Sequence, residues 1–471
     1  MKEKNIVVLG AGVTGLSAAY RLSKDPAVKV YVIEKRNAVG GLCGSFKDGD
    51  FVLDYGPHKF YTLLDGIVDE LKELMGEELM ERDKAQSIYM HGRYYTYPLK
   101  MTEMLTRFPL SESFKILFSY GTQLLKNFIS NKDAVTYEEF IKERFGNGLY
   151  QSIFAPMAEK IYGDPSKLDR KLAEVRISSP GLLSVVKQLL FRSKIDKSIQ
   201  APKFHYPQMG YGRIPEKMRE IAERNGATFH LGAEVNRLEI HDGKVAAVQF
   251  TDGNGDRQRL VCDELIYTIP IAQIGKLIPD YSPRLESVCE KVKSRNVIIY
   301  YFLLKSGPIL PSMWVFFPEQ EFRFGRLSEM TKFSPSTAPA GHTALMVDFT
   351  CDPEDPVWKM SDQALGDLLL GQLEPLNLFQ ADQVVKRFSK RFQSFYPVYN
   401  VGFQNNLNEI RELEGRFKNL YFIGRTGDFN YNNADQCMDM GFQAADHILG
   451  RRKGEWNGLR TERFDRYKIV D

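Results

Sequence analysis

The chain has 471 residues, a length that favours two or three domains over one. Its 63 basic and 60 acidic residues leave a net charge of +3, which is too balanced to indicate a nucleic-acid partner, and 43% hydrophobic residues are typical of a globular protein. Five dispersed cysteines without a Cys-x-x-Cys pair argue against a metal site and suit a reducing compartment.

No targeting or membrane-spanning segment is expected. The apolar run at residues 6–9 is too short for a signal peptide, and no stretch reaches the roughly 18 apolar residues that a membrane span needs. The most apolar helical region, residues 116–125, is interrupted by polar side chains, which favours a buried helix over membrane contact. The sequence therefore predicts a cytoplasmic protein without an integral membrane segment, and it leaves the oligomeric state open.

The first motif joins a β-branched run to a helix through Gly10-Ala-Gly12-Val-Thr-Gly15. The runs at 5–9 and 29–33 predict parallel strands, with a helix at 16–22 between them. Gly10 permits the tight turn, Gly12 lets the backbone approach a pyrophosphate, and Gly15 lets the helix pack on the strand. Glu34, 19 residues after Gly15, can accept hydrogen bonds from ribose hydroxyls. The pattern predicts a Rossmann-like fold that binds FAD or NAD rather than NADP.

A second glycine pair, Gly40-Gly41, follows Glu34 by six residues. It resembles the double-glycine motif of FAD enzymes of the glutathione-reductase and amine-oxidase type. A second close backbone pass beside an extended cofactor accounts for such a pair, and a plain turn is the alternative. The pair favours FAD over NAD.

The cofactor fold returns twice along the chain. A helix at 214–225 and short strands up to Pro270 form the first return, and a strand at 419–425 with a helix from about 434 to 449 forms the second. Residues 1–99, 200–275 and 396–450 are therefore expected to form one discontinuous FAD-binding domain of the α/β class. The remainder predicts a helical insertion at 100–199 with helices at 137–145 and 181–190, an α+β substrate-binding region at 276–395, and a charged, peripheral tail at 451–471.

Four further segments combine unusual chemistry. In Asp54-Tyr-Gly56-Pro-His58, the Gly-Pro step forces a tight turn that presents His58. The other three are Ile161-Tyr-Gly-Asp-Pro165 with Arg176 eleven residues later, Phe322-Arg-Phe-Gly-Arg326-Leu-Ser-Glu329, and Tyr396-Pro-Val-Tyr399 followed by the stretch from Gly424 to Asp435. The planar fork of arginine suits a diphosphate. Each of these side chains also has a structural interpretation, as part of a helix surface, a polar strand face or a packed core.

Together these segments resemble UDP-galactopyranose mutase, a family of flavoenzymes of nucleotide-sugar metabolism within the amine oxidase and protoporphyrinogen oxidase superfamily. Residues 55–62 match six of the eight positions in that family's Tyr-Gly-Pro-His-Ile-Phe-His-Thr segment. Arg326 and Glu329 match its Thr-Arg-x-x-Glu strand, and its last motif is matched at the same spacing by Gly424, Arg425, Tyr431 and Asp435. The resemblance runs in order from residue 5 to residue 449.

The resemblance implies an enzyme of cell-surface polysaccharide biosynthesis that interconverts the pyranose and furanose forms of a nucleotide sugar through an adduct at N5 of reduced FAD. The sequence does not show what reduces the flavin; NAD(P)H is a candidate, although no second dinucleotide fingerprint is found. The resemblance places His58 beside the flavin, Arg176 and Arg326 on the diphosphate, and Tyr396 and Tyr431 in hydrogen bonds to it. With the glycine motifs, it implies cofactor contacts at Gly10, Gly12, Thr14, Gly15, Glu34, Lys35, Gly41, Leu42, Gly56, Val235, Gly424, Arg425, Asn433 and Asp435.

The sequence also departs from that family. Tyr162 replaces a tryptophan at the sugar, and Met157 replaces the tyrosine that stacks on uracil, so the base and the sugar stay open. The segment from Val398 to Gly402 resembles flavin oxidoreductases of the amine-oxidase and protoporphyrinogen-oxidase type. The alternative is therefore an FAD-dependent oxidoreductase that takes a hydride from its substrate, and a third class is a non-catalytic flavin-binding protein. Convergent arginines would favour a diphosphate, and an apolar tunnel would favour oxidation.

Overall fold

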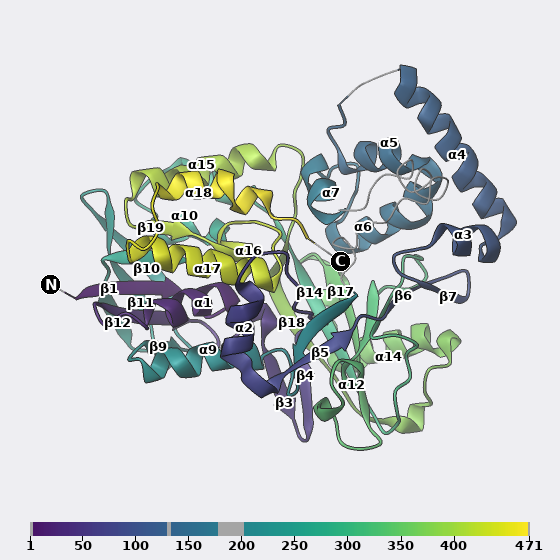
Figure 1. Ribbon diagram of the computed structural model, residues 1–471, viewed down its shortest axis with the longest axis horizontal. Coiled ribbons are helices and arrows are strands. Elements are labelled where there is room, and N and C mark those ends of the chain that lie inside the picture. The colour runs from purple at the N-terminus through teal and green to yellow at the C-terminus, as the bar shows by residue number, and fades with distance from the viewer. Residues whose placement is uncertain (1–2, 130–132, 178–201, 470–471) are drawn as a thin grey trace.

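The computed structural model describes residues 3–129, 133–177 and 202–469 (Figure 1). The helix expected at 181–190 lies outside these residues. Within them, the chain forms a cofactor-type α/β unit, a large mixed sheet and a helical insertion that extends to one side (Figure 1). The predicted α/β fold class, with an inserted α+β region and a helical subdomain, is confirmed.

A five-stranded parallel sheet is the base of the α/β unit. Its order is β19-β13-β1-β2-β9, with strands β19 (Leu420–Phe422), β13 (Glu264–Tyr267), β1 (Lys4–Leu9), β2 (Val28–Glu34) and β9 (Thr228–Leu231). Three stretches far apart in sequence therefore meet in one sheet. Residues 6–9 of β1 are fully buried, as the β-branched run predicts for a central parallel strand.

Helices cover this sheet and pack closely on one another. α1 (Val13–Leu22) lies against α17 (Ala434–Ile448) and α9 (Arg213–Arg224). A Cβ on Gly441 of α17 would lie only 2.5 Å from the carbonyl oxygen of Thr14, so this helix contact requires glycine. A three-stranded antiparallel sheet, β10 (Glu234–His241), β11 (Lys244–Thr251) and β12 (Arg257–Val261), completes the unit.

A seven-stranded sheet forms the floor of the second region. Its order is β18 (Val384–Pro397), β14 (Ser294–Leu304), β17 (Thr343–Cys351), β16 (Arg326–Glu329), β15 (Trp314–Phe316), β6 (Gln86–Met90) and β7 (Arg93–Thr96). β6 and β7 correct the expected boundary at residue 99, because β6 pairs in parallel with β15 and so joins the sheet of the inserted region. α14 (Asp362–Leu373) covers one face, and the other face looks toward the α/β unit.

Smaller elements connect these parts. They are β3 (Ser45–Asp48), β4 (Phe51–Asp54), β5 (Leu79–Asp83), β8 (Lys203–Pro207), α2 (Ile67–Met75), α10 (Ile274–Leu277), α11 (Pro283–Cys289), α12 (Met330–Phe333), α13 (Pro356–Lys359), α15 (Phe403–Arg416), α16 (Gly424–Gly427) and α18 (Trp456–Glu462).

The helical insertion contains α3 (Met101–Arg107), α4 (Leu110–Ile129), α5 (Tyr137–Leu149), α6 (Ala155–Tyr162) and α7 (Arg170–Arg176). A capping box of Thr136 and Glu139 starts α5 where a helix is predicted. The expectation of a buried helix at 116–125 is half wrong. Ile116 and Tyr120 are buried, but Phe118 and Leu125 on the opposite face of α4 are 63% and 68% exposed. Within the described ranges, no helix combines the length and the apolar character of a membrane span.

The C-terminal segment is packed, not peripheral. Trp456, Leu459 and Phe464 are buried against the α/β unit. Arg460 donates 2.6 Å to Oε2 of Glu414 and also pairs with Asp428, whose side chain is fully buried. The charged composition of this segment predicted a peripheral tail, and the prediction is wrong because Arg460 forms ion pairs in the interior.

Candidate active site

A cavity of about 880 Å³ is lined by residues of the α/β unit, the seven-stranded sheet and the helical insertion. This volume lies at the upper end of the range for small-molecule sites, so the cavity has room for an extended cofactor and a substrate.

The glycine-rich turn after β1 forms one end of the cavity. Gly10 has φ +98°, and its N–H donates 2.8 Å to the carbonyl of Ile33. A Cβ on Gly15 would lie 2.1 Å from the carbonyl oxygen of Gly10, so only glycine allows α1 to approach β1. A Cβ on Gly12 would meet no protein atom within 4 Å and would instead enter the cavity at the start of α1. This open cradle at a helix N-terminus fits a pyrophosphate.

The second glycine pair packs directly on that turn. The N–H of Gly40 donates 2.7 Å to the carbonyl of Ala11. Gly41 has φ +55°, and a Cβ there would lie 3.2 Å from the Cα of Gly12. The pair is therefore not a plain surface turn, since it extends the wall beside the pyrophosphate cradle.

The carboxylate of Glu34 stands at the end of β2. Its Oε2 accepts from the N–H of Ala11 and its Oε1 from the N–H of Arg36, both at 2.8 Å. Each oxygen keeps a lone pair for a ribose hydroxyl. Lys35 pairs with Glu234 at 2.6 Å near the exposed edge of the cavity. Cradle and carboxylate together fit the adenosine and pyrophosphate half of FAD.

Most of the predicted site residues line this cavity. They are His58, Arg176, Arg326, Tyr396, Tyr431, Gly10, Gly12, Thr14, Glu34, Lys35, Gly41, Leu42, Gly56, Val235, Arg425 and Asn433. Three others do not line it. Gly15 and Gly424 are packing positions, and a Cβ on Gly424 would lie 2.6 Å from Oγ1 of Thr14. Asp435 faces a separate, smaller pocket, where burial raises its pKa to about 6.

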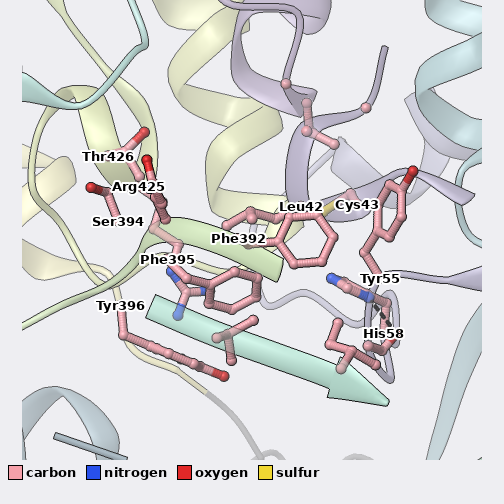
Figure 2. Close-up of a pocket in the computed structure, with 18 of the residues that line it drawn as sticks. Leu42, Cys43, Tyr55, His58, Phe392, Ser394, Phe395, Tyr396, Arg425 and Thr426 are labelled. Atoms are coloured by element: carbon pink, nitrogen blue, oxygen red, sulfur yellow. Dashed lines mark hydrogen bonds between the residues drawn. The ribbon is translucent and has the colours of Figure 1, made fainter. Parts of the chain in front are cut away.

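His58 faces the cavity from the turn after β4, and Figure 2 shows it across from Phe392. Its Nδ1 lies 2.8 Å from the carbonyl oxygen of Gly56, which can only accept, so Nδ1 carries the proton. Burial, together with a smaller effect of the charges of Arg326 and Arg425, lowers the pKa of His58 to about 4, although the hydrogen bond to Gly56 opposes this shift. The imidazole is therefore neutral at pH 7, with an unprotonated Nε2 that can accept a hydrogen bond.

A wall of tyrosine rings and guanidinium groups forms the other side of the cavity, and Figure 2 shows two of its members, Tyr396 and Arg425. Tyr396 and Tyr431 stack with centroids 5.8 Å apart. The guanidinium carbon of Arg425 lies 5.0 and 4.4 Å from these two ring centroids, and that of Arg176 lies 5.1 Å from the ring of Tyr431. Burial raises the pKa of Tyr396 to about 12, so its phenol stays a hydrogen-bond donor at neutral pH. The buried Tyr162 packs edge-on against both rings.

Arg326 on β16 projects from the floor beside this wall. It holds Asp348 of the neighbouring strand β17 in a two-pronged ion pair, with Nε–Oδ1 at 3.0 Å and Nη2–Oδ2 at 2.8 Å. The pair leaves the two N–H groups of Nη1 for a ligand. Sequence reasoning missed Asp348. Its signal was a single acidic residue within the otherwise uncharged strand Thr343–Cys351.

Lys160 on α6 is a second cavity residue that the sequence did not reveal. Its Nζ donates to the carbonyl oxygens of Phe317, Glu319 and Phe324 at 2.6, 2.7 and 3.2 Å. Burial lowers its pKa to about 7. This ammonium fixes the segment that leads into Arg326 and ties the helical insertion to the sheet.

The cavity is strongly cationic. Its described lining contains the basic residues Lys35, Arg36, Lys59, Lys160, Arg176, Arg326, Arg391 and Arg425, but the only carboxylates there are Glu34, Glu234 and Asp348. Seven of these basic groups are charged at neutral pH and Lys160 is partly charged, so against three carboxylates the positive excess is at least four. The two charges of an FAD pyrophosphate would neutralise part of it, and the remainder favours a second anionic ligand.

The fold and this site define a flavoprotein, and comparison with known proteins gives its class. Residues 13–449 match the family of flavin containing amine oxidoreductases, and the chain belongs to that family. It is an FAD-dependent enzyme of the amine oxidase superfamily, because the cradle fits the cofactor that this family carries.

Its relatives include coproporphyrinogen III oxidases, phytoene desaturases and pyranose mutases. A coproporphyrinogen III oxidase of Bacillus subtilis is 20% identical, over 95% of this chain and 98% of that protein. A probable UDP-galactopyranose mutase of Klebsiella pneumoniae is 21% identical, over 95% and 96%. Among solved structures, a reduced UDP-galactopyranose mutase superposes with a TM-score of 0.83 at 22% identity, over 97% of this chain and 96% of that one. The likeness at this identity shows the shared fold.

Proposed function

We propose that this flavoenzyme isomerises a nucleotide-activated sugar between its pyranose and furanose forms, and its relative from Klebsiella, a probable UDP-galactopyranose mutase, supports a sugar nucleotide as the substrate. The observation that carries the proposal is the wall in which Arg176 and Arg425 flank Tyr431, with Arg326 beside it. Guanidinium forks and phenol donors form the donor set that a diphosphate prefers. The cationic excess that remains beyond one pyrophosphate supports a second diphosphate in the same cavity.

The proposal assigns a role in substrate binding to the arginine, tyrosine and histidine side chains of the cavity. Reduced FAD would supply the nucleophile that attacks the anomeric carbon. Arg176 and Nη1 of Arg326 would neutralise the diphosphate as it leaves, and the neutral phenols of Tyr396 and Tyr431 would donate to its oxygens. The unprotonated Nε2 of His58 would accept a hydrogen bond from a sugar hydroxyl.

The test is an anaerobic turnover assay. The purified flavoprotein is reduced with dithionite and given UDP- and dTDP-linked sugars, including UDP-galactopyranose and UDP-galactofuranose, and the products are separated by ion-exchange chromatography. Isomerisation that requires the reduced flavin supports the proposal. Neither conversion nor binding across the panel would overturn it.

A matched pair of arginine variants tests the assignment of the wall. Arg326→Ala should lower UDP affinity about 100-fold, because a charge-assisted pair is lost from a buried site. Arg323→Ala is the control, since Arg323 lies in the same segment but pairs with Asp355 and does not line the cavity. Unchanged UDP affinity in Arg326→Ala would refute the role of this arginine.

A second candidate is an oxidoreductase, favoured by the aromatic floor of the cavity. Trp314, Phe316, Phe349 and Phe392 offer an apolar surface to a flat substrate. The relative from Bacillus is a coproporphyrinogen III oxidase, and the carboxylates of such a tetrapyrrole could pair with the same arginines. Aerobic conversion of a porphyrinogen to a fluorescent porphyrin by the oxidised protein, without nucleotide-sugar turnover, would select this candidate.

A further inference from the structure

The outer face of α4 exposes a row of large apolar side chains. Thirteen large hydrophobic residues are exposed within the described ranges, and five of them lie on this one helix. They are Leu110, Phe114, Leu117, Phe118 and Leu125, with exposed fractions of 45–84%. The rings of Phe114 and Phe118 stack in the open, 6.0 Å apart and inclined by 13°. We call these five side chains the α4 stripe.

The α4 stripe has no partner within the described chain. Counted from Leu110, the other four residues follow after four, seven, eight and fifteen positions, and this spacing places all five side chains on one helix face. The opposite face already packs on α5, where Ile116 and Tyr120 are buried and the N–H of Gly148 donates 2.8 Å to Oγ of Ser119. Figure 1 shows α4 along the outer edge of the insertion, on the side away from the two sheets.

The size of the α4 stripe argues against a second copy of the chain as its occupant. Five side chains at these exposures offer on the order of 500 Å², taking about 150–250 Å² for a full aromatic side chain as the upper guide. A stable protein interface buries about 800 Å² on each partner. An apolar patch of this area is nevertheless as large as the largest patches on typical monomers, which are often functional.

The charges around the α4 stripe indicate which surface covers it. Lys115 and Lys126 are exposed on one border of the stripe. Residues 100–126 contain four basic side chains and two acidic ones, Glu103 and Glu112, so this edge of the molecule carries a net charge of +2. Phenylalanine and leucine on one face with lysines at the border are the composition of a helix that lies in a membrane interface.

We propose that α4 docks this protein on an anionic lipid bilayer, with the α4 stripe in the acyl boundary and Lys115 and Lys126 at headgroup level. The long lysine stems allow their ammonium groups to reach the headgroups from the border of the stripe. The helix lies on the bilayer and does not cross it, in agreement with the absence of a spanning helix in the described ranges. This docking is independent of which reaction the cavity catalyses.

The test is flotation of the full-length holoprotein with phosphatidylcholine vesicles and with vesicles that also contain phosphatidylglycerol. The wild type should float with the anionic vesicles. Phe114→Ser/Phe118→Ser should bind at least tenfold more weakly while keeping its flavin, because both side chains are exposed and contribute little to the fold. Lys115→Glu/Lys126→Glu should lose about fivefold per lysine at low salt. Leu368→Ser/Val385→Ser, which removes exposed apolar side chains elsewhere, is the matched control and should float like the wild type.

Three results would overturn the docking proposal. One is no flotation of the wild type with either vesicle. Another is equal flotation of the wild type and the double phenylalanine variant. The third is a wild type that sediments as a dimer in analytical ultracentrifugation and becomes monomeric in Phe114→Ser/Phe118→Ser, without vesicle binding, since this would assign the α4 stripe to a second copy.

Discussion

Replacing Gly12 by alanine should separate cofactor binding from folding. Gly12 has φ −74° and ψ 174°, a conformation open to any residue, so alanine brings no backbone strain. Its Cβ would meet no protein atom within 4 Å and would enter the cavity where the pyrophosphate is expected. Loss of one or two hydrogen bonds to a charged group costs about 3 kcal/mol, so the Kd for FAD should rise about 100-fold.

The same substitution three residues later is the control. In Gly15→Ala the new Cβ would lie 2.1 Å from the carbonyl oxygen of Gly10, so α1 must move off β1 and little folded protein is expected. Gly12→Ala, in contrast, should unfold at the temperature of FAD-stripped wild type, measured by circular dichroism. FAD affinity is measured by flavin fluorescence quenching on the stripped proteins. A Kd for Gly12→Ala within about threefold of the wild type would refute the pyrophosphate cradle.

Three further predictions follow from single side chains. Glu34→Ala should weaken FAD retention at least tenfold, because both carboxylate oxygens stand at the end of β2 beside the cradle; an unchanged Kd would remove its ribose role. His58 has its pKa lowered from 6.5 to about 4 by burial, so the stability it contributes above pH 6.5 is lost as the pH falls toward 4, when the unfolded chain binds a proton that the folded one does not. Between pH 7 and pH 5 this amounts to about 2 kcal/mol, or about 2 °C in Tm for a chain of this size, and His58→Gln should lose that much less on acidification; equal losses in both proteins would contradict the assignment. Arg460→Met should lower Tm by about 3 °C, because it leaves the buried carboxylates of Glu414 and Asp428 without this partner, and a change under about 1 °C in differential scanning calorimetry would show that the C-terminal segment adds little.

The sequence by itself determined the cofactor half of the protein. Gly10, Gly12 and Gly15 sit within ten residues of one another, and their roles follow from local geometry, since a tight turn, an open cradle and a close helix approach each exclude a Cβ. Local periodicity likewise predicted β1 and β2, and also α5, α9 and α17. Each motif is short and contiguous, so it can be recognised in the sequence, and the order of the motifs along the chain indicated the superfamily.

The ion-pair and hydrogen-bond partners inside the cavity, the packing of the C-terminal segment and the exposure of α4 were decided by the tertiary structure alone. Asp348 meets Arg326 only because β17 and β16 are neighbours, and Lys160 meets three carbonyls only because α6 lies against the sheet. The charged composition of residues 451–471 predicted a peripheral tail, but in the structure Arg460 of this segment pairs with the buried carboxylate of Glu414. The apolar pattern of α4 did not predict whether the outer face of this helix is buried or exposed. Sequence patterns show which side chains share a face, but only packing shows what that face meets, since such contacts join residues tens to hundreds of positions apart.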